Sequence, residues 1–212
     1  DSDLEPPYLC LLVSGGHTAI VRVEDYENIT LIAQSRDDAV GEAFDKVARV
    51  LGLPYPGGPE IQKKAREGKA VYDMPVPKSN GLDSLYFSYS GLKTFVINLV
   101  HKLEQRGEDL PVCDIAASFQ KCAVKQLIDA LKLVSEKTGV KKIAIAGGVS
   151  ANEELRSRAD ELKEAGCEVH YPKPIYCTDN AAMIGSAAYF AIKCGKAPAD
   201  LSLDAKATVP LQ

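Results

Sequence analysis

The sequence lacks several patterns that mark common protein classes. Its six cysteines, at positions 10, 113, 122, 167, 177 and 194, form no C-x-x-C pair and no repeated spacing, so neither a zinc ribbon nor a disulfide framework is indicated. No apolar run approaches the roughly 18 residues that a membrane span needs, and the first five residues are acidic where a signal peptide is basic and then apolar. We therefore expect a soluble, intracellular protein with reduced thiols.

Motifs of several common enzyme classes are also absent. The three histidines, His17, His101 and His170, form no H-E-x-x-H motif and no i, i+4 pair, which disfavours a self-contained zinc peptidase. No G-x-S-x-G nucleophile elbow and no G-x-x-x-x-G-K-[ST] loop occurs, which argues against common serine hydrolases and P-loop proteins. His17 remains of interest because it follows a Ser-Gly-Gly turn.

The composition is that of a folded globular protein with a slight excess of acidic residues. Of 212 residues, 46% are hydrophobic, and 25 Lys and Arg against 29 Asp and Glu give a net charge of −4. This length makes one large domain or two small lobes. Because the bulk charge does not attract phosphate, a nucleic-acid partner must be held by a local basic patch. Lys63, Lys64, Arg66 and Lys69 form one candidate, although a solvated helix face explains them equally well.

Hydrophobic periodicity predicts an α/β protein. Apolar runs at 8–13 and 18–23, joined by a short turn, are typical of a hairpin, and 29–34 adds a third strand. The other expected elements are strands at 142–146 and 168–171, helices at 37–51, 60–67, 92–105, 113–137, 152–165 and 180–194, a rigid loop at 54–59 and an irregular connection at 69–90. Strands that alternate with helices in the second half imply a mixed or parallel sheet covered by helices.

Two apolar strands end in Gly-Gly beside a small polar residue. Ser14-Gly15-Gly16 follows the first strand, and Gly147-Gly148-Val149-Ser150 follows the strand at 142–146. Glycine lets backbone N–H groups approach a bound group that a Cβ would keep away, and the second turn leads into a helix N-terminus that favours anions. Both turns are candidates to cradle phosphate or ribose, and ordinary tight turns are the alternative. Gly57-Gly58 forms a third glycine loop.

Three polar side chains are candidate ligands, each with a structural alternative. Asp45 lies on the charged side of a predicted helix, where the alternative is a solvated carboxylate paired with Arg49. Asn152 opens a predicted helix, so its alternative role is an N-cap. Asp179 precedes the helix at 180–194 and is either a helix-start acid or a ligand to metal or water.

Six segments along the chain carry a more specific signal. They are LLVSGGHT (11–18), GEAFDK (41–46), YPGGP (55–59), FSYSGLKT (87–94), AGGVSAN (146–152) and TDNAAMI (178–184). In this order they resemble the motifs of the tRNA N6-adenosine threonylcarbamoyltransferase family, in its bacterial form, over essentially the whole chain. The absence of a peptidase motif speaks against the family's older name, O-sialoglycoprotein endopeptidase or glycoprotease.

The resemblance implies the actin-like ATPase (ASKHA) fold, an α/β architecture in which a mixed sheet is flanked by helices and nucleotide and metal occupy the cleft between two lobes. It implies that residues 1–178 form mainly the C-terminal lobe and residues 179–212 a final helix and tail that return toward the N-terminal lobe. The implied reaction transfers a threonylcarbamoyl group from threonylcarbamoyl-adenylate to N6 of the adenosine 3′ of the anticodon, in tRNAs that read codons beginning with A. AMP is the leaving group.

The resemblance also implies roles for individual residues. Asp45 and Gly58 would hold the ribose and adenine side, Asn152 would contact the nucleotide, and Asp179 would ligate a metal; Asp45 is also the only candidate base. The implied cofactors are an adenine nucleotide and one divalent metal per subunit, which is iron or zinc, or magnesium with ATP. The residues that would line the substrate phosphate are Leu12, Val13, Ser14, Gly15 and Gly16.

The sequence departs from the family's pattern in one respect. In the family, two metal-ligand histidines of an H-x-x-G-H-like motif lie upstream of the first strand, and this chain starts after that point. We therefore expect a fragment or a shortened protein that is inactive alone, with Asp179 as a lone ligand. The implied partners are tRNA, threonylcarbamoyl-adenylate, an inactive actin-like paralogue and a small P-loop ATPase, in the cytoplasm and without a membrane. A noncatalytic actin-like nucleotide-binding scaffold is the alternative, and a metallopeptidase is the weakest one.

Overall fold

The fold is built on a five-stranded mixed sheet with the strand order β3-β2-β1-β4-β5. The first three strands form an antiparallel meander, β4 pairs parallel to β1, and β5 pairs parallel to β4. The predicted hairpin and the mixed sheet flanked by helices are therefore confirmed. The strands are β1 (Tyr8–Val13), β2 (Thr18–Val23), β3 (Ile29–Gln34), β4 (Lys142–Ala146) and β5 (Glu168–His170).

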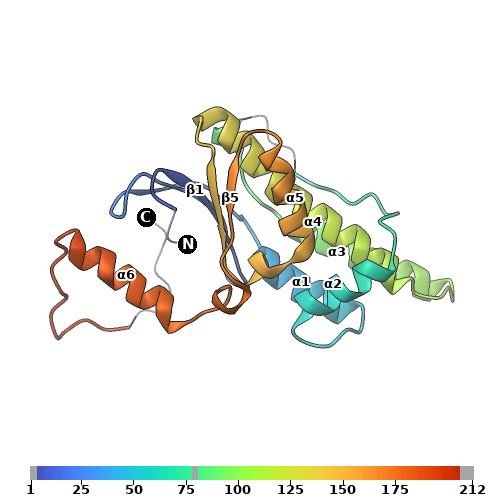
Figure 1. The fold of residues 1–212 in the computed structure, drawn as a ribbon. Coiled ribbons are helices and arrows are strands. Elements are labelled where there is room, and N and C mark those ends of the chain that lie inside the picture. Colours follow the sequence, from blue (N-terminus) through green and yellow to red (C-terminus); the bar gives the residue numbers. More distant parts are fainter. Residues whose placement is uncertain (1–3, 78–80, 206–212) are drawn as a thin grey trace.

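The structure, a computed structural model, describes residues 4–77 and 81–205 (Figure 1). Within these ranges no helix is both long and apolar enough to cross a membrane. Parts of three sequence predictions lie outside the described residues. They are the acidic start at 1–3, a piece of the irregular connection at 78–80 and the end of the predicted tail at 206–212.

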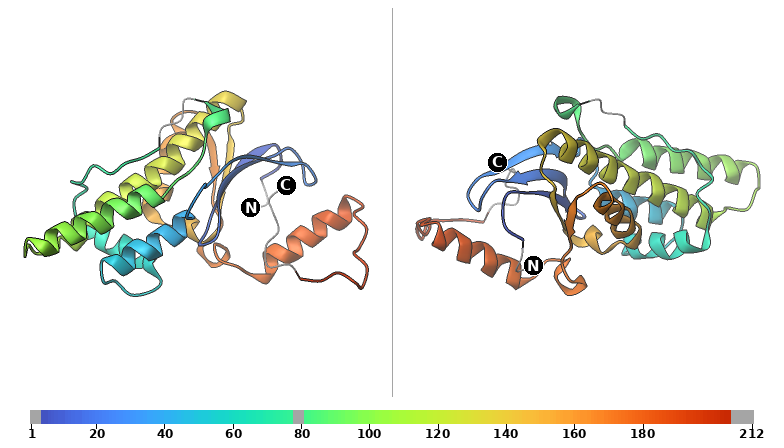
Figure 2. Two further views of the ribbon diagram at one scale, coloured as in Figure 1. Left: turned by 180° about the vertical axis from the view of Figure 1, so that it is seen from behind. Right: turned by 45° about the horizontal axis from the view of Figure 1, so that its top comes forward.

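Five α-helices lie on one side of the sheet, as Figures 1 and 2 show. The long helix α4 packs against α2 and α5, and its end is marked by Gly139, whose φ of +73° is a left-handed conformation suited to glycine. The helices are α1 (Val40–Val50), α2 (Gly57–Glu67), α3 (Ser90–Gln105), α4 (Val112–Thr138) and α5 (Glu153–Asp160).

The core lies between the sheet and these five helices. Because successive side chains of a strand point to opposite faces, Leu9, Leu11 and Val13 of β1 turn to the helices and are fully buried. Phe44 of α1 and Phe119 of α4 meet edge to face, with ring centroids 5.0 Å apart. This contact joins α1 to α4 within the core.

The helix α6 (Ala181–Lys193) lies on the other side of the sheet (Figure 2). Phe190 of α6 stacks on Tyr26, in the turn between β2 and β3, with ring centroids 3.8 Å apart. Much of its apolar surface is exposed, including 64% of Ile184 and 74% of Ile192. Within the described residues, α6 therefore presents an uncovered apolar surface.

The prediction that residues 54–59 contain no helix is wrong for 57–59, because α2 begins at Gly57. The first four N–H groups of a helix have no partner within the helix, so a proline in the first turn costs no hydrogen bond. Pro59 occupies that turn, and the Gly57 N–H finds its partner outside the helix, at Asp45 Oδ1.

Two other predicted helices are shorter than expected. The helix predicted over 37–51 begins at Val40, because Asp37 and Asp38 lie before it and bind groups on other elements. The helix predicted over 152–165 ends as α5 at Asp160 and continues as the 3-10 helix η3 (Glu161–Lys163). The spacing of the apolar residues does not distinguish the last turn of an α-helix from a short 3-10 helix.

Candidate functional site

Two glycine turns meet at the carboxyl edge of the sheet. β1 and β4 are parallel neighbours with Leu12 opposite Ala146, so the turns that follow them lie side by side. A Cβ on Gly147 would lie 2.3 Å from Val13 O, and its φ of +97° disfavours any residue with a side chain. Gly147 is therefore required for the two strand ends to meet. Ligands of open α/β sheets bind outside the carboxyl ends of such strands.

The first turn is tied to the start of α1. Ser14 O accepts a hydrogen bond from Gly41 N at 3.1 Å, and Thr18 Oγ1 accepts one from Val40 N at 2.8 Å. These bonds satisfy N–H groups at the start of α1, where the N-cap residue Ala39 offers no side-chain acceptor of its own. Within the turn, Ser14 Oγ accepts a hydrogen bond from His17 N at 3.0 Å. The backbone of the turn is therefore held in place before any ligand binds.

A cavity of about 380 Å³, which we call the glycine cavity, opens beside both turns against α1 and α2. Four of the predicted site residues line it: Gly15, Asp45, Gly58 and Asn152. Among the described residues that line it, Asp45 is the only charged one. Aromatic and amide side chains to which the sequence analysis gave no role in the site also line it, namely Phe44, Tyr55 and Gln62.

Several glycines around this cavity have no internal steric reason to be glycine. A Cβ built on Gly15, Gly16 or Gly58 would meet nothing within 4 Å, and one on Gly148 would meet only Thr178 Cγ2 at 3.9 Å. None of the four has a positive φ. The packing and backbone of this chain therefore tolerate a side chain at each of them. A ligand that approaches the backbone closely does not, because a Cβ would occupy its place.

Asp45 connects α1 to the start of α2. Its Oδ1 accepts a hydrogen bond from Gly57 N at 2.7 Å. A Cβ on Gly57 would lie 2.6 Å from Ala48 Cβ, so here glycine is required by packing. The alternative in which Asp45 pairs with Arg49 is wrong among the described residues, since its carboxylate turns to α2 instead. The carboxylate thereby lines the glycine cavity.

Asn152 fills the structural role proposed as its alternative and also lines the glycine cavity. Its Oδ1 accepts a hydrogen bond from Leu155 N at 3.0 Å and caps α5. Its Nδ2 donates to Oε1 of the buried Gln120, on α4, at 3.0 Å. Sequence reasoning missed Gln120, because a partner 32 residues away leaves no local pattern. Gln62 was missed for the same reason: its Oε1 accepts from Glu153 N at 2.8 Å.

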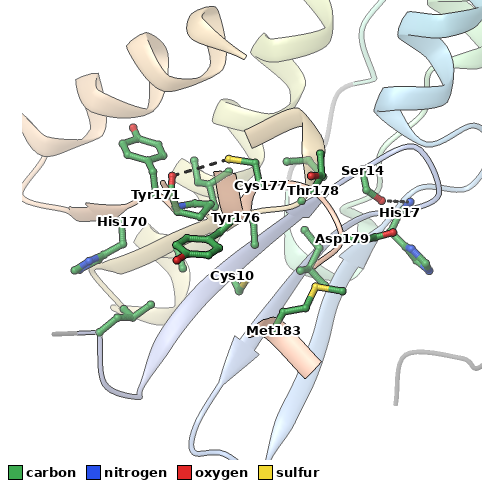
Figure 3. A pocket seen from close by; sticks show the side chains of 18 of the residues that line it. Cys10, Ser14, His17, His170, Tyr171, Tyr176, Cys177, Thr178, Asp179 and Met183 are labelled. Atoms are coloured by element: carbon green, nitrogen blue, oxygen red, sulfur yellow. Dashed lines mark hydrogen bonds between the residues drawn. The ribbon is translucent and has the colours of Figure 1, made fainter. Parts of the chain in front are cut away.

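A second cavity, of about 480 Å³, lies on the face of the sheet that is turned toward α6 (Figure 3). We call it the sheet-face cavity. Leu12, Val13 and Ser14 line it from β1 and the first turn, and Asp179 lines it from the segment that precedes α6. His17 lies beside Ser14 and near Asp179 at one end of this cavity (Figure 3). The glycine turns thus separate two adjacent cavities.

The predicted site residues are divided between these cavities rather than gathered in one. The boundary runs through the turns: Ser14 faces the sheet-face cavity and Gly15 the glycine cavity, and Gly147 and Gly148 are divided in the same way. Gly16 lines neither of the two, and its N–H donates to Ser14 Oγ at 3.2 Å. A ligand that occupies both cavities must cross the backbone of the two turns.

Asp179 does not complete a metal site with other residues of the described chain. Among residues 4–77 and 81–205, no group of three or more His, Cys, Asp or Glu side chains is arranged to hold a metal ion. Metal sites in proteins commonly use three or four protein ligands. The residues present therefore do not fit a complete site. Asn180, not Asp179, caps α6, because its Oδ1 accepts from Met183 N at 3.1 Å.

Three further groups that line the sheet-face cavity have a raised pKa: Tyr8, Cys10 and Tyr171. Burial raises the pKa of the Cys10 thiol to about 12. Burial, and then the hydrogen bond to Asp160, raise the pKa of Tyr171. Since a nucleophilic cysteine needs its thiolate form, Cys10 is a packing residue here. Besides Cys10, the wall formed by β1 presents the apolar Leu12 and Val13 and the aromatic Tyr8.

The basic patch suggested by the sequence is partly neutralised. Lys64 pairs with Glu67 at 3.3 Å on α2, and Arg66 pairs with Glu153 at the start of α5. These pairs reduce the attraction of this surface for phosphate. The patch therefore provides weak support for a nucleic-acid interface.

The chain is similar in sequence to one family of known proteins. A family model described as TsaD, tRNA N6-adenosine threonylcarbamoyltransferase, matches residues 1–186. Proteins of that name from Clostridium perfringens (strain 13 / Type A) and Clostridium beijerinckii (strain ATCC 51743 / NCIMB 8052) are 50% identical over 211 residues, which is 99% of this chain and 62% of theirs. One from Clostridium botulinum (strain 657 / Type Ba4) is 52% identical over 190 residues, 89% of this chain and 56% of its own. The chain thus spans less than two thirds of the length of these relatives.

Among solved structures, the chain is similar to full-length HypF in its phosphate- and nucleotide-bound form. The TM-score is 0.69 at 16% identity, over 92% of this chain and 34% of that one. HypF from T. kodakarensis gives a TM-score of 0.51 at 20% identity, over 77% of this chain and 21% of that one. At these identities the similarity concerns the fold alone.

Proposed function

Because the chain belongs to the tRNA N6-adenosine threonylcarbamoyltransferase family and has its actin-like ATPase fold, we propose that it carries the nucleotide-binding part of an enzyme that modifies tRNA. The proposed reaction transfers a threonylcarbamoyl group from threonylcarbamoyl-adenylate to N6 of the adenosine 3′ of the anticodon. The tRNAs are those that read codons beginning with A. AMP is released.

The observation that carries this proposal is the open space at the glycines of the two turns and of α2. Gly15, Gly58 and Gly148 line one cavity, and the chain's own packing requires glycine at none of them. Glycines of this kind let backbone N–H groups contact a phosphate directly. Its described lining also contains one carboxylate, that of Asp45. This combination of backbone donors and one acid is suited to a nucleotide.

The residue roles follow from the lining of the two cavities. We assign Asp45 and Gly58 to the ribose and adenine side, where the bond from Gly57 holds the carboxylate ready to accept from a ribose hydroxyl. We assign Asn152 to a nucleotide contact through the second N–H of its amide, since the first is bonded to Gln120. The substrate phosphate is then expected along the first turn, lined by Leu12, Val13, Ser14, Gly15 and Gly16.

The reaction is an acyl-type transfer at a carbamoyl carbon. The site must stabilise the charge that develops on one oxygen and on the departing phosphate, and preorganised backbone N–H groups do this effectively. The N6 amine is a weak nucleophile, so we expect positioning to supply much of the rate. Asp45 is the only candidate base that we name. Its bond to Gly57 supports the ribose role more directly than proton transfer.

Two further assignments depend on groups from outside the described residues. We propose that Asp179 contributes one carboxylate to a divalent metal, iron or zinc, or magnesium with ATP, whose other ligands come from outside the described residues. We also propose that residues 1–178 form the C-terminal lobe and that residues 179–212, including the exposed apolar helix α6, pack against an N-terminal lobe. The apolar exposure of Ile184 and Ile192 supports this second assignment.

The proposed partners are tRNA, threonylcarbamoyl-adenylate, an inactive actin-like paralogue and a small P-loop ATPase, all in the cytoplasm. A noncatalytic nucleotide-binding scaffold is the alternative function, and the same cavities serve it equally. The two functions differ only in whether the transfer reaction occurs, which makes the transfer assay decisive between them.

The test measures transfer with the complete gene product and its purified partners, using threonylcarbamoyl-adenylate and unmodified tRNA. Gly58→Ala places a methyl group in the glycine cavity, and we expect it to weaken AMP and ADP binding by about 10-fold or more, equivalent to about 1.4 kcal/mol. Gly91→Ala is the matched control, because its Cβ meets only Pro75 Cγ at 3.9 Å.

Each outcome of this test has a distinct meaning. Transfer by the wild type, reduced by Gly58→Ala but not by Gly91→Ala, supports the enzyme. Nucleotide binding that Gly58→Ala weakens, without any transfer by the wild type, supports the scaffold. Equal nucleotide binding by both variants and the wild type contradicts the assignment of the glycine cavity.

A further inference from the structure

We propose that Arg156, on α5, is a positioning residue that holds the second glycine turn and the segment leading to Asp179 in a fixed relation. This proposal deepens the proposed function and rests on it. Arg156 lies in neither of the two cavity linings. It acts through the backbone groups that it binds, and these belong to the two segments that frame both cavities.

The guanidinium of Arg156 binds both segments at once. Its Nε donates to Ser150 O at 2.7 Å, in the 3-10 helix η2 (Gly148–Ala151) that forms the second turn. Its Nη2 donates to Pro172 O at 3.1 Å and to Cys177 Sγ at 3.5 Å. Pro172 and Cys177 line the sheet-face cavity, and Cys177 is two residues before Asp179. One side chain therefore connects a wall of each cavity.

Tyr171 completes the attachment from the other side. The Arg156 guanidinium lies over its ring, 5.1 Å from the centroid, and the Tyr171 hydroxyl donates to Arg156 O at 3.0 Å. The same hydroxyl lies 3.0 Å from Asp160 Oδ1. The segment after β5 is thus fastened to α5 at Tyr171, Pro172 and Cys177, as Figure 3 shows for Tyr171 and Cys177 on one wall of the cavity.

The geometry requires arginine rather than any cation. Three acceptors in different directions are reached by the planar fork of a guanidinium, whereas a lysine ammonium is a point charge on a flexible stem. The acceptors are two carbonyl oxygens and a sulfur, and none is a carboxylate. The charge of Arg156 is therefore not used in a salt bridge with them. Arg156 instead supplies hydrogen-bond donors that point in fixed directions toward the three acceptors.

Arg158, on the same helix, shows the contrast. It pairs with Glu154 at 3.2 Å and Glu161 at 3.6 Å, which are neighbours at i−4 and i+3. These are local pairs on the surface of one helix, and such pairs contribute little to stability. Arg158→Lys keeps a positive charge that can pair with both Glu154 and Glu161. It is the matched control for Arg156→Lys, because it makes the same chemical change without touching either segment.

The experiment compares Arg156→Lys and Arg158→Lys with the wild type in the complete gene product. Hydrogen exchange is measured over 147–152 and 171–180, and over β1, β2 and β3 as a reference. We expect Arg156→Lys to speed exchange in both segments, by about 10-fold, while the reference strands stay as in the wild type. In the transfer assay we expect kcat to fall by about 10-fold or more with little change in KM for tRNA, because displaced groups lower rate more than tRNA affinity.

Every outcome bears on the proposal. Exchange as in the wild type, or faster exchange in only one of the two segments, overturns the coupling. Faster exchange that extends to β1–β3 overturns it as well, because the effect is then a general loss of stability. Arg156→Gln keeps a planar donor. If the direction of the hydrogen bonds is what matters, exchange in the two segments should be slower in Arg156→Gln than in Arg156→Lys. If the wild type performs no transfer, the proposed function fails, and the exchange data still decide the role of Arg156.

Discussion

Asp45 and Gly57 join α1 to α2 through one hydrogen bond, from the Gly57 N–H to Asp45 Oδ1 at 2.7 Å. The bond satisfies an N–H group at the start of α2, and it also holds the carboxylate at the edge of the glycine cavity. Gly57 and Gly58 are adjacent, yet the first is enclosed by the helices and the second faces open space. The two glycines therefore predict opposite effects of the same substitution.

Gly57→Ala should destabilise the chain by about 1–3 kcal/mol, the range typical of overpacking. Its new Cβ would lie 2.6 Å from Ala48 Cβ and 2.7 Å from Asp45 Cα, and neither atom is the end of a flexible side chain. Gly58→Ala should leave stability unchanged or raise it by about 0.5–1 kcal/mol, because alanine is favoured over glycine in a helix. Urea unfolding of both variants measures this. Equal stability of the two variants contradicts the packing described at Gly57.

Asp37→Ala should destabilise the chain by about 1 kcal/mol at pH 7, a typical value for a lost helix cap. Asp37 Oδ1 accepts from Tyr89 N at 2.8 Å and Ser90 N at 3.3 Å, and so caps α3 from a distant part of the chain. Partial burial acts to raise the pKa of Asp37, but hydrogen bonds from Ser88, Tyr89 and Ser90 together lower it below the ordinary value of 3.8.

The sign of the pH dependence follows from this lowered pKa. A carboxylate with a lower pKa in the folded state stabilises the fold above its unfolded-state pKa, and the contribution is lost as the pH falls through the folded-state value. The difference in unfolding free energy between the wild type and Asp37→Ala should therefore be largest at pH 7 and become smaller below about pH 4. Urea unfolding at pH 7 and pH 3 tests this, with Asp109→Ala, at an exposed position, as the control. A difference that is the same at both pH values argues against the cap.

Cys10 should react slowly with iodoacetamide at pH 8, although it lines a cavity. Burial raises its pKa to about 12, so about one thiol in ten thousand is ionised at that pH. The exposed Cys194 is the internal comparison, and we expect it to be labelled at least about 100-fold faster. Peptide mapping by mass spectrometry at several times gives both rates. Similar rates at the two cysteines contradict the raised pKa of Cys10.

Charged substitutions on α6 test the assignment of residues 179–212. Ile184→Glu and Ile192→Glu alter side chains that are 64% and 74% exposed, so in the chain of 212 residues the unfolding free energy should change by less than about 0.5 kcal/mol. In the complete gene product we expect both to lower the melting temperature, because the proposed packing of α6 against an N-terminal lobe would bury the added charge. Lys193→Glu, at the exposed end of the helix, is the control. An unchanged melting temperature in the complete gene product contradicts the proposed packing of α6.

Most of the elements were predictable because their signals are local. The alternating and continuous apolar runs of β1, β2 and β4 and the apolar stripe of α1 are visible in any short window, and so are the glycine turns that follow β1 and β4. The start of α2 was not predictable in this way. Whether Gly57 joins a loop or a helix depends on an acceptor, Asp45, which lies on a different element.

The amino-acid sequence determined which chemical groups this protein brings to its site: two Gly-Gly turns, the carboxylates of Asp45 and Asp179 and the amide of Asn152. Only the tertiary structure decided how these groups are divided. The parallel pairing of β1 with β4 brings the two turns together across more than a hundred residues of chain and separates a glycine cavity from a sheet-face cavity. The tertiary structure also decided which side chains orient the site, namely Gln120 for Asn152 and Arg156 for the second turn. Contacts between elements depend on how the helices pack on the sheet, and no periodicity along the chain records them.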